Sequence, residues 1–129
     1  MMMHLKAAAV ALAAALALSG AAQAAEEEHF LIDTAADLAK LCAVTPENPA
    51  YDAAIHMCHG YLVGVHHFHE ALAESMEVAV YCEERASPVP TRDEVTADFV
   101  AWLGQNPTVA DEEALEGLLQ YAAARFPCS

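Results

Sequence analysis

The four cysteines constrain the fold of this chain more than any other feature of its sequence. Cys42, Cys58, Cys82 and Cys128 are separated by 16, 24 and 46 residues, so no two of them form the C-x-x-C pair typical of zinc sites and redox centres. Their number is even. In an oxidising compartment this arrangement predicts two structural disulfides rather than a metal site.

The N-terminal segment predicts that the protein is exported. Lys6 gives a short basic start, residues 7–18 form an uncharged apolar run, and Ala22-Gln23-Ala24 has the small-x-small pattern of a signal cleavage site. Twelve apolar residues are too few to cross a bilayer as a helix, which takes about 20. We therefore expect a cleavable secretory signal over residues 1–24 and a single periplasmic domain over residues 25–129, with a retained membrane anchor as the alternative.

The charge of the expected mature chain is strongly negative. Without Lys6, four basic residues stand against 19 acidic ones, a net charge of −15. Such a charge repels phosphate backbones and anionic lipids, which argues against nucleic-acid and membrane partners. It favours a basic partner, although a merely solvated acidic surface would look the same.

Apolar spacing and capping signals predict an all-α fold, a small disulfide-stapled bundle of four helices or slightly more. Asn48-Pro49 suits the start of the longest helix, and Thr91 with Glu94 forms a capping box. The expected helices run from Thr34 to about Cys42, from Asn48 to about Val78, from Thr91 to about Gly104, and from the acidic start Asp111-Glu112-Glu113 to Phe126, with Leu115, Leu118, Leu119, Ala122 and Phe126 on the core face of the last.

Helix geometry favours one of the three possible disulfide pairings. Cys58 and Cys82 lie near opposite ends of the second expected helix, roughly 28 Å apart along its axis, whereas bridged Cα atoms lie about 5–6 Å apart. Cys42 ends the first helix and faces the start of the second. The last two helices return Cys128 towards Cys82, so we predict the pairs Cys42–Cys58 and Cys82–Cys128.

Histidines gather on the second expected helix. At about 100° per residue, one arc of its surface carries His56, His59, His66 and His67, and Glu70, Glu74 and Glu77 continue it. The opposite face is the predicted core stripe, formed by Met57, Tyr61, Val65, Phe68, Leu72 and Met76. We therefore expect the histidines to be exposed, either as a solvated face, as a partner-binding surface or as a metal site.

Metal binding and catalysis find little support in the sequence. His59 and His66 are roughly 10 Å apart along the helix, too far to bind one ion, and His66 with Glu70 offers only two ligands. No serine stands in a G-x-S-x-G motif and no cysteine is left as a nucleophile. We expect no cofactor and no enzymatic activity. Gly60 and Gly64 are predicted to permit a close helix crossing, within the chain or between subunits.

The ordered set of motifs resembles the Rap/Tai family of immunity proteins against type VI secretion amidases. The elements that carry the resemblance are Cys42, Cys58-His59-Gly60-Tyr61-Leu62-Val63-Gly64, Tyr81-Cys82, Thr91, Trp102-Leu103, Asn106-Pro107, Ala114 and Phe126-Pro127-Cys128. They span nearly the whole mature chain. The chain departs from the family pattern in the longer segment Glu83–Pro90 and in His66 and His67, which follow the Gly-rich motif.

The resemblance implies an exported helical protein, commonly a homodimer, that inhibits a peptidoglycan amidase toxin by binding to it. Residues on the histidine face and on the Glu83–Pro90 segment are the candidate partner contacts: His59, His66, His67, Glu70, Glu74, Glu83, Glu84 and Arg85. A periplasmic metal-binding protein using the histidine face and an acid-responsive periplasmic chaperone are the alternative functions.

Overall fold

The structure is a computed structural model that describes residues 25–129, and the expected signal segment lies outside the described residues. Over this range the chain forms helices only, which confirms the all-α prediction. The four α-helices are α1 (Ala35–Cys42), α2 (Tyr51–Met76), α3 (Arg92–Gln105) and α4 (Ala114–Arg125), and the short 3-10 helices are η1 (Glu27–Leu31), η2 (Glu83–Arg85) and η3 (Pro107–Val109).

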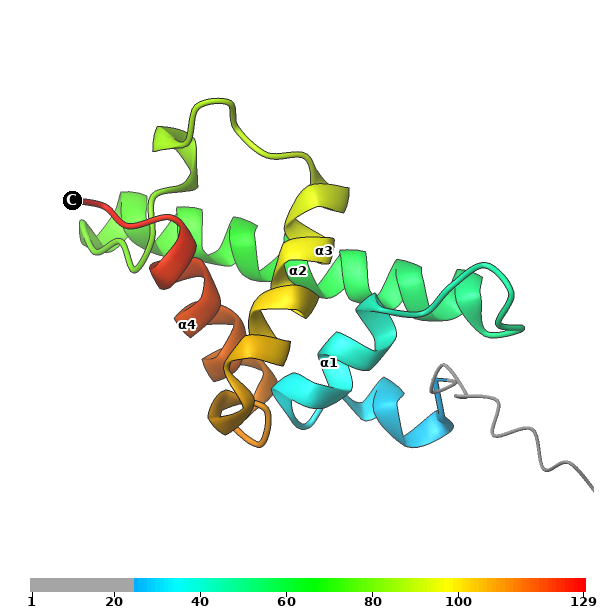
Figure 1. The fold of residues 1–129 in the computed structure, drawn as a ribbon. Coiled ribbons are helices and arrows are strands. Elements are labelled where there is room, and N and C mark those ends of the chain that lie inside the picture. The colour runs from blue at the N-terminus through cyan, green and yellow to red at the C-terminus, as the bar shows by residue number, and fades with distance from the viewer. Residues whose placement is uncertain (1–24) are drawn as a thin grey trace, which may run out of the picture.

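The three shorter α-helices lie along one side of the long helix α2 (Figure 1). α1 lies at the centre of the bundle, where it contacts α2, α3 and α4. Its Leu38 and Leu41 are fully buried, together with Phe99 of α3. The core is thus small, and most of its side chains are leucine, alanine or aromatic residues.

Capping side chains fix where the helices begin. The Thr34 and Thr91 hydroxyls accept from the N–H groups of Asp37 and Glu94, whose carboxylates bond back to the threonine N–H groups. Both starts were predicted. The predicted start of α2 was wrong by two residues, because the Asn48 side chain accepts from the Ala50 N–H and caps the turn that precedes the helix.

Helix α4 packs closely against α1 at Gly117. A methyl group added to Gly117 would lie 2.5 Å from the Cβ of Ala35, so only glycine fits at this position. The buried face of α4 is centred on Gly117, Leu118 and Tyr121. The prediction of Leu115 as a core residue was therefore wrong, since this side chain points outward and is 44 % exposed.

Two disulfides join distant parts of the bundle. Cys42 is bonded to Cys58 with an S–S distance of 2.08 Å, and Cys82 is bonded to Cys128 with an S–S distance of 2.09 Å. These are the two pairs that the helix geometry favoured. The first joins the end of α1 to α2, and the second joins the segment after α2 to the end of the chain.

Candidate functional site

Helix α2 buries a different face from the one that its apolar pattern predicted. Its buried residues are Ala54, Cys58, Leu62 and His69. The disulfide explains the rotation, because Cys58 must face Cys42, and residues four apart on a helix share a face. The predicted core stripe was wrong at four of its six positions: Met57, Phe68, Leu72 and Met76 are exposed.

The histidines of α2 accordingly differ in their surroundings. His56 and His67 are exposed as predicted, His59 and His66 are half-buried, and His69 is buried. His69 lies 11 residues after Cys58, close to three helical turns, so it falls on the same face. The position of Cys58 was therefore the signal that could have identified His69 as a core residue.

His69 anchors the segment that follows α2. Its ring stacks on Tyr81 with centroids 3.9 Å apart, and its Nε2 accepts a hydrogen bond of 2.9 Å from the Val80 backbone N–H. Burial, together with the nearby Glu83, Glu70 and Glu84 carboxylates, raises the pKa of Tyr81 to about 12. The Tyr81 phenol therefore remains neutral at physiological pH.

His66 connects α2 to η2. Its Nδ1 lies 3.2 Å from the Tyr81 hydroxyl and 3.4 Å from a Glu83 carboxylate oxygen, while its Nε2 lies 3.5 Å from a Glu70 carboxylate oxygen. The structure thus brings together three of the candidate contact residues. The two ring nitrogens point in different directions, so the two carboxylates do not converge on one ion. Within residues 25–129 no group of three or more His, Cys, Asp or Glu residues could hold a metal ion.

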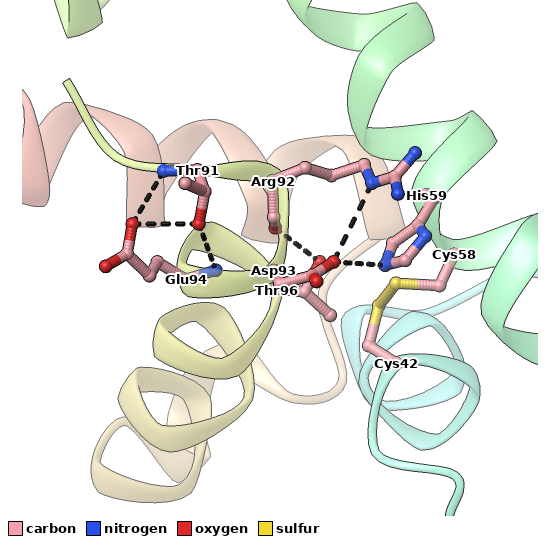
Figure 2. A network of polar contacts seen from close by, with 8 residues as sticks. All are labelled: Cys42, Cys58, His59, Thr91, Arg92, Asp93, Glu94 and Thr96. Atoms are coloured by element: carbon pink, nitrogen blue, oxygen red, sulfur yellow. Dashed lines mark hydrogen bonds and ion pairs between the residues drawn. A yellow bond between two sulfur atoms is a disulfide. The ribbon is translucent and has the colours of Figure 1, made fainter. Parts of the chain in front are cut away.

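His59 lies in a different cleft, between α2 and the start of α3. Its Nε2 lies 3.6 Å from a carboxylate oxygen of Asp93, beside the Cys42–Cys58 disulfide (Figure 2). The cleft has a volume of about 510 Å³. Burial lowers the pKa of His59, and Arg92 lowers it further, while Asp93 partly offsets both. Sequence reasoning did not identify Arg92 or Asp93, which are distant from His59 along the chain.

The remaining candidate contacts lie on the end of α2 and on the segment that follows it. The Arg85 guanidinium donates to the Cys128 carbonyl oxygen, so this cation is engaged with the end of the chain. Glu74 and Glu84 are exposed and line one shallow cleft with His66 and Glu70. The predicted contact set is therefore divided, with His59 on one cleft and His66, Glu70, Glu74 and Glu84 on another.

Charge divides α2 and the following segment into two parts. Residues 53–69 contain five histidines and no Asp, Glu, Lys or Arg, whereas residues 70–84 contain five glutamates and no basic residue. We call residues 53–69 the uncharged part of α2. Its exposed side carries Met57, Gly60, Val63, Gly64 and Phe68. Added methyl groups at Gly60 and Gly64 would meet no atom within 4 Å, so these glycines do not serve a crossing within the described chain.

Residues 70–84 also expose large apolar side chains. Leu72, Met76, Val78 and Val80 are all exposed, and Met76 is 64 % exposed. The last buried residue of α2 is His69, so the bundle does not cover this end of the helix. In Figure 1 this end of α2 extends past α4.

No helix within residues 25–129 has the length and apolar character needed to cross a membrane.

Comparison with known proteins identifies the chain. The family model of the Rap1a immunity proteins matches residues 34–128, a range that includes all four cysteines and both candidate clefts. Searches of curated proteins and of solved structures gave no match. The matched range covers most of the sequence, and the chain therefore belongs to the Rap1a family of immunity proteins, which act against secreted effectors.

Proposed function

We propose that this protein is a periplasmic, non-enzymatic inhibitor that binds a peptidoglycan amidase effector of the type VI secretion system. The family match carries the proposal. The acidic composition supports it, because a charge of −15 over residues 25–129 would accelerate association with a basic enzyme. All four cysteines are bonded and thus cannot act as nucleophiles, which agrees with a role in binding rather than catalysis.

The test is inhibition of a purified enzyme. The full chain is exported, purified from the periplasm in its oxidised form and mixed with the amidases encoded beside its gene, and peptidoglycan hydrolysis is measured. We expect tight binding that silences one of these enzymes at a stoichiometric ratio. Hydrolysis that continues at full rate with every one of them would contradict the proposal.

We propose further that two copies associate through the uncharged part of α2. Two copies of so acidic a protein repel each other, and this part exposes apolar side chains while containing no Asp or Glu of its own. Gly60 and Gly64 leave room for a helix of the second copy to approach closely. The interface would bury the exposed Met57 and Phe68 side chains.

Light scattering combined with gel filtration tests this assembly. We expect a dimer for the unaltered protein and a monomer for Gly60→Leu/Gly64→Leu, because leucine side chains would fill the space between the helices. Gly104→Leu is the matched control, since Gly104 is also helical and open to space. A monomeric unaltered protein, or a glycine variant that stays dimeric, would refute the assembly.

A further inference from the structure

We propose that Lys40 is a nucleophilic lysine, at which carboxylic esters with a good leaving group acylate the protein. Lys40 lies in the last turn of α1 and is the only lysine in residues 25–129. The inference concerns a modification site and does not depend on the proposed inhibition of an amidase. It follows from the hydrogen bonds of one buried histidine and from the groove that Lys40 lines.

Both ring nitrogens of His29 face nitrogen donors. The ring is 4 % exposed, and its Nδ1 accepts a hydrogen bond of 2.9 Å from the Glu26 backbone N–H. A neutral imidazole has one donor and one acceptor, so its proton lies on Nε2. That Nε2 is 3.0 Å from the Nζ atom of Lys40. An ammonium group has three donors and no acceptor, whereas a neutral amine can accept the Nε2 proton. The geometry therefore fits Lys40 as a neutral amine.

The surrounding carboxylates do not pair with Lys40. Asp37 is three residues earlier on α1, and its Oδ2 accepts from the Thr34 N–H at 3.0 Å and from the Thr34 hydroxyl at 2.8 Å. Glu26 and Glu47 are exposed. Lys40 occurs in none of the ion pairs within residues 25–129. Nearby negative charge favours an ammonium, but the hydrogen bonds of His29 leave no acceptor for one.

An apolar groove gives a reagent access to Lys40. The groove has a volume of about 680 Å³ and lies between α1, α3, η3 and the loop after α1. Besides Lys40, its lining includes small or apolar side chains: Ala36, Ala39, Ala43, Val44, Val100 and Leu103. Sites for small molecules in proteins have similar volumes and similarly apolar walls. The groove therefore suits the hydrocarbon chain of an acyl group that reacts at Nζ.

The reaction is a substitution at the ester carbonyl carbon. The lone pair of Nζ forms a bond to this carbon, and the bond from the carbon to the leaving oxygen breaks. The leaving oxygen keeps the electron pair and takes up the proton that the amine loses, so no oxidant or reductant is needed. The product is an amide, whose nitrogen is a donor and not an acceptor. Acylation would thus remove the contact between Lys40 of α1 and His29 of η1.

The test measures acylation rates at neutral pH with p-nitrophenyl acetate and p-nitrophenyl butyrate. Gln120→Lys adds an ordinary lysine at an exposed position of α4, as a reference within the same molecule. Mass spectrometry of peptides gives the rate of amide formation at each lysine. We expect Lys40 to react at least about tenfold faster than the reference, because an ordinary lysine is almost entirely protonated at neutral pH. Equal rates at the two lysines would overturn the proposal.

A second variant tests the role of His29. In His29→Gln the side-chain oxygen can accept from an ammonium, so the rate at Lys40 should fall several-fold, with circular dichroism confirming the fold. His67→Gln, at an exposed position of α2, is the matched control and should leave the rate unchanged. If Lys40 reacts as fast in His29→Gln as in the unaltered protein, the proposal is wrong. The comparison with the reference lysine decides the question even if His29→Gln does not fold.

The two esters test the role of the groove. Butyrate should react several-fold faster than acetate at Lys40 and no faster at the reference lysine, because only the groove offers apolar surface to the longer chain. If Lys40 shows no preference for butyrate, the groove does not hold the acyl group and this part of the proposal is wrong. None of these outcomes depends on an amidase, so their failure leaves the proposed function standing.

Discussion

The imidazole ring of His69 is stacked on the phenol ring of Tyr81, and its Nε2 accepts the hydrogen bond of the Val80 N–H. Because Nε2 is an acceptor, the proton of the neutral ring lies on Nδ1. This pair joins α2 to the segment that leads to Cys82, so it connects the longest helix to the second disulfide.

Replacing His69 should loosen this connection. His69→Leu removes the acceptor of the Val80 N–H, and an unsatisfied buried donor costs about 1–3 kcal/mol of unfolding free energy. Urea unfolding followed by circular dichroism measures the difference. His67→Leu, at an exposed position of the same helix, is the control and should change the unfolding free energy little. Equal effects of the two substitutions would mean that the Val80 hydrogen bond adds no stability.

Gly117 should be intolerant of the smallest added side chain. Gly117→Ala places a methyl group against Ala35 and forces α4 away from α1, at a cost of roughly 1–3 kcal/mol typical of overpacking. Gly104→Ala is the control, because it meets no neighbour and should stabilise its helix by up to about 1 kcal/mol. Thermal unfolding of the two variants should therefore shift in opposite directions.

Asp98 should make stability depend on acid. Arg125 donates two hydrogen bonds of 2.7 Å to its carboxylate, and Tyr121 donates one of 3.0 Å. The bond from Arg125 is the main cause that holds the pKa of Asp98 below its usual value of 3.8, the bond from Tyr121 adds to it, and partial burial opposes both.

A carboxylate whose pKa is lowered by folding stabilises the protein above its unfolded pKa, and this stabilisation disappears as the pH falls through the folded pKa. Asp98→Asn should therefore lower the unfolding temperature at neutral pH, with an effect of at most about 1 kcal/mol for a partly exposed pair. Below the usual pKa of 3.8 the variant and the unaltered protein should converge. Calorimetry across this pH range checks the prediction, and Asp111→Asn, at an exposed position, is the control. A difference that stays constant down to strong acid would rule out the carboxylate as its source.

The second disulfide should matter more for stability than any single side chain. It closes a loop across a separation of 46 residues, and loops of this size are associated with roughly 4 kcal/mol in the chain-entropy model. Cys82→Ser/Cys128→Ser should lower the unfolding free energy by several kcal/mol, measured by urea unfolding without reductant. Val89→Ser, an exposed change within the same loop, should have little effect.

The sequence predicted the features that depend on local chemistry or covalent geometry. The Thr34 and Thr91 caps stand where the pattern placed them, since each needs only the residue three positions on. The disulfide pairs followed from the length of α2. Apolar periodicity could not predict which face of α2 is buried, because the uncharged part of α2 has no charged residue to mark the solvent side. The bond between Cys58 and Cys42 determines which face is buried, and for this reason Phe68 is exposed and His69 is buried.

The candidate site was predictable only in part. The pair His66 and Glu70 followed from their spacing of four on α2, but Glu83 joins them because η2 folds back against α2, and His59 meets Asp93 of α3. Such long-range contacts leave no local pattern in the sequence. The 3-10 helices η1, η2 and η3 were all missed for a related reason, since helices of three to five residues are too short to show a period.

The bond between Cys82 and Cys128 also determines how the molecule bears a mechanical load. Ser129 is the residue that follows Cys128, and α3 and α4 both lie inside the covalent ring that the bond closes. Tension applied to the carboxyl end therefore passes from Cys128 directly to Cys82 and into α2, and it bypasses the peptide backbone of α3 and α4. A force applied at the carboxyl end would therefore act on α2, while the backbone of α3 and α4 carries no tension. These two helices would stay folded under a load that acts on this end of the chain.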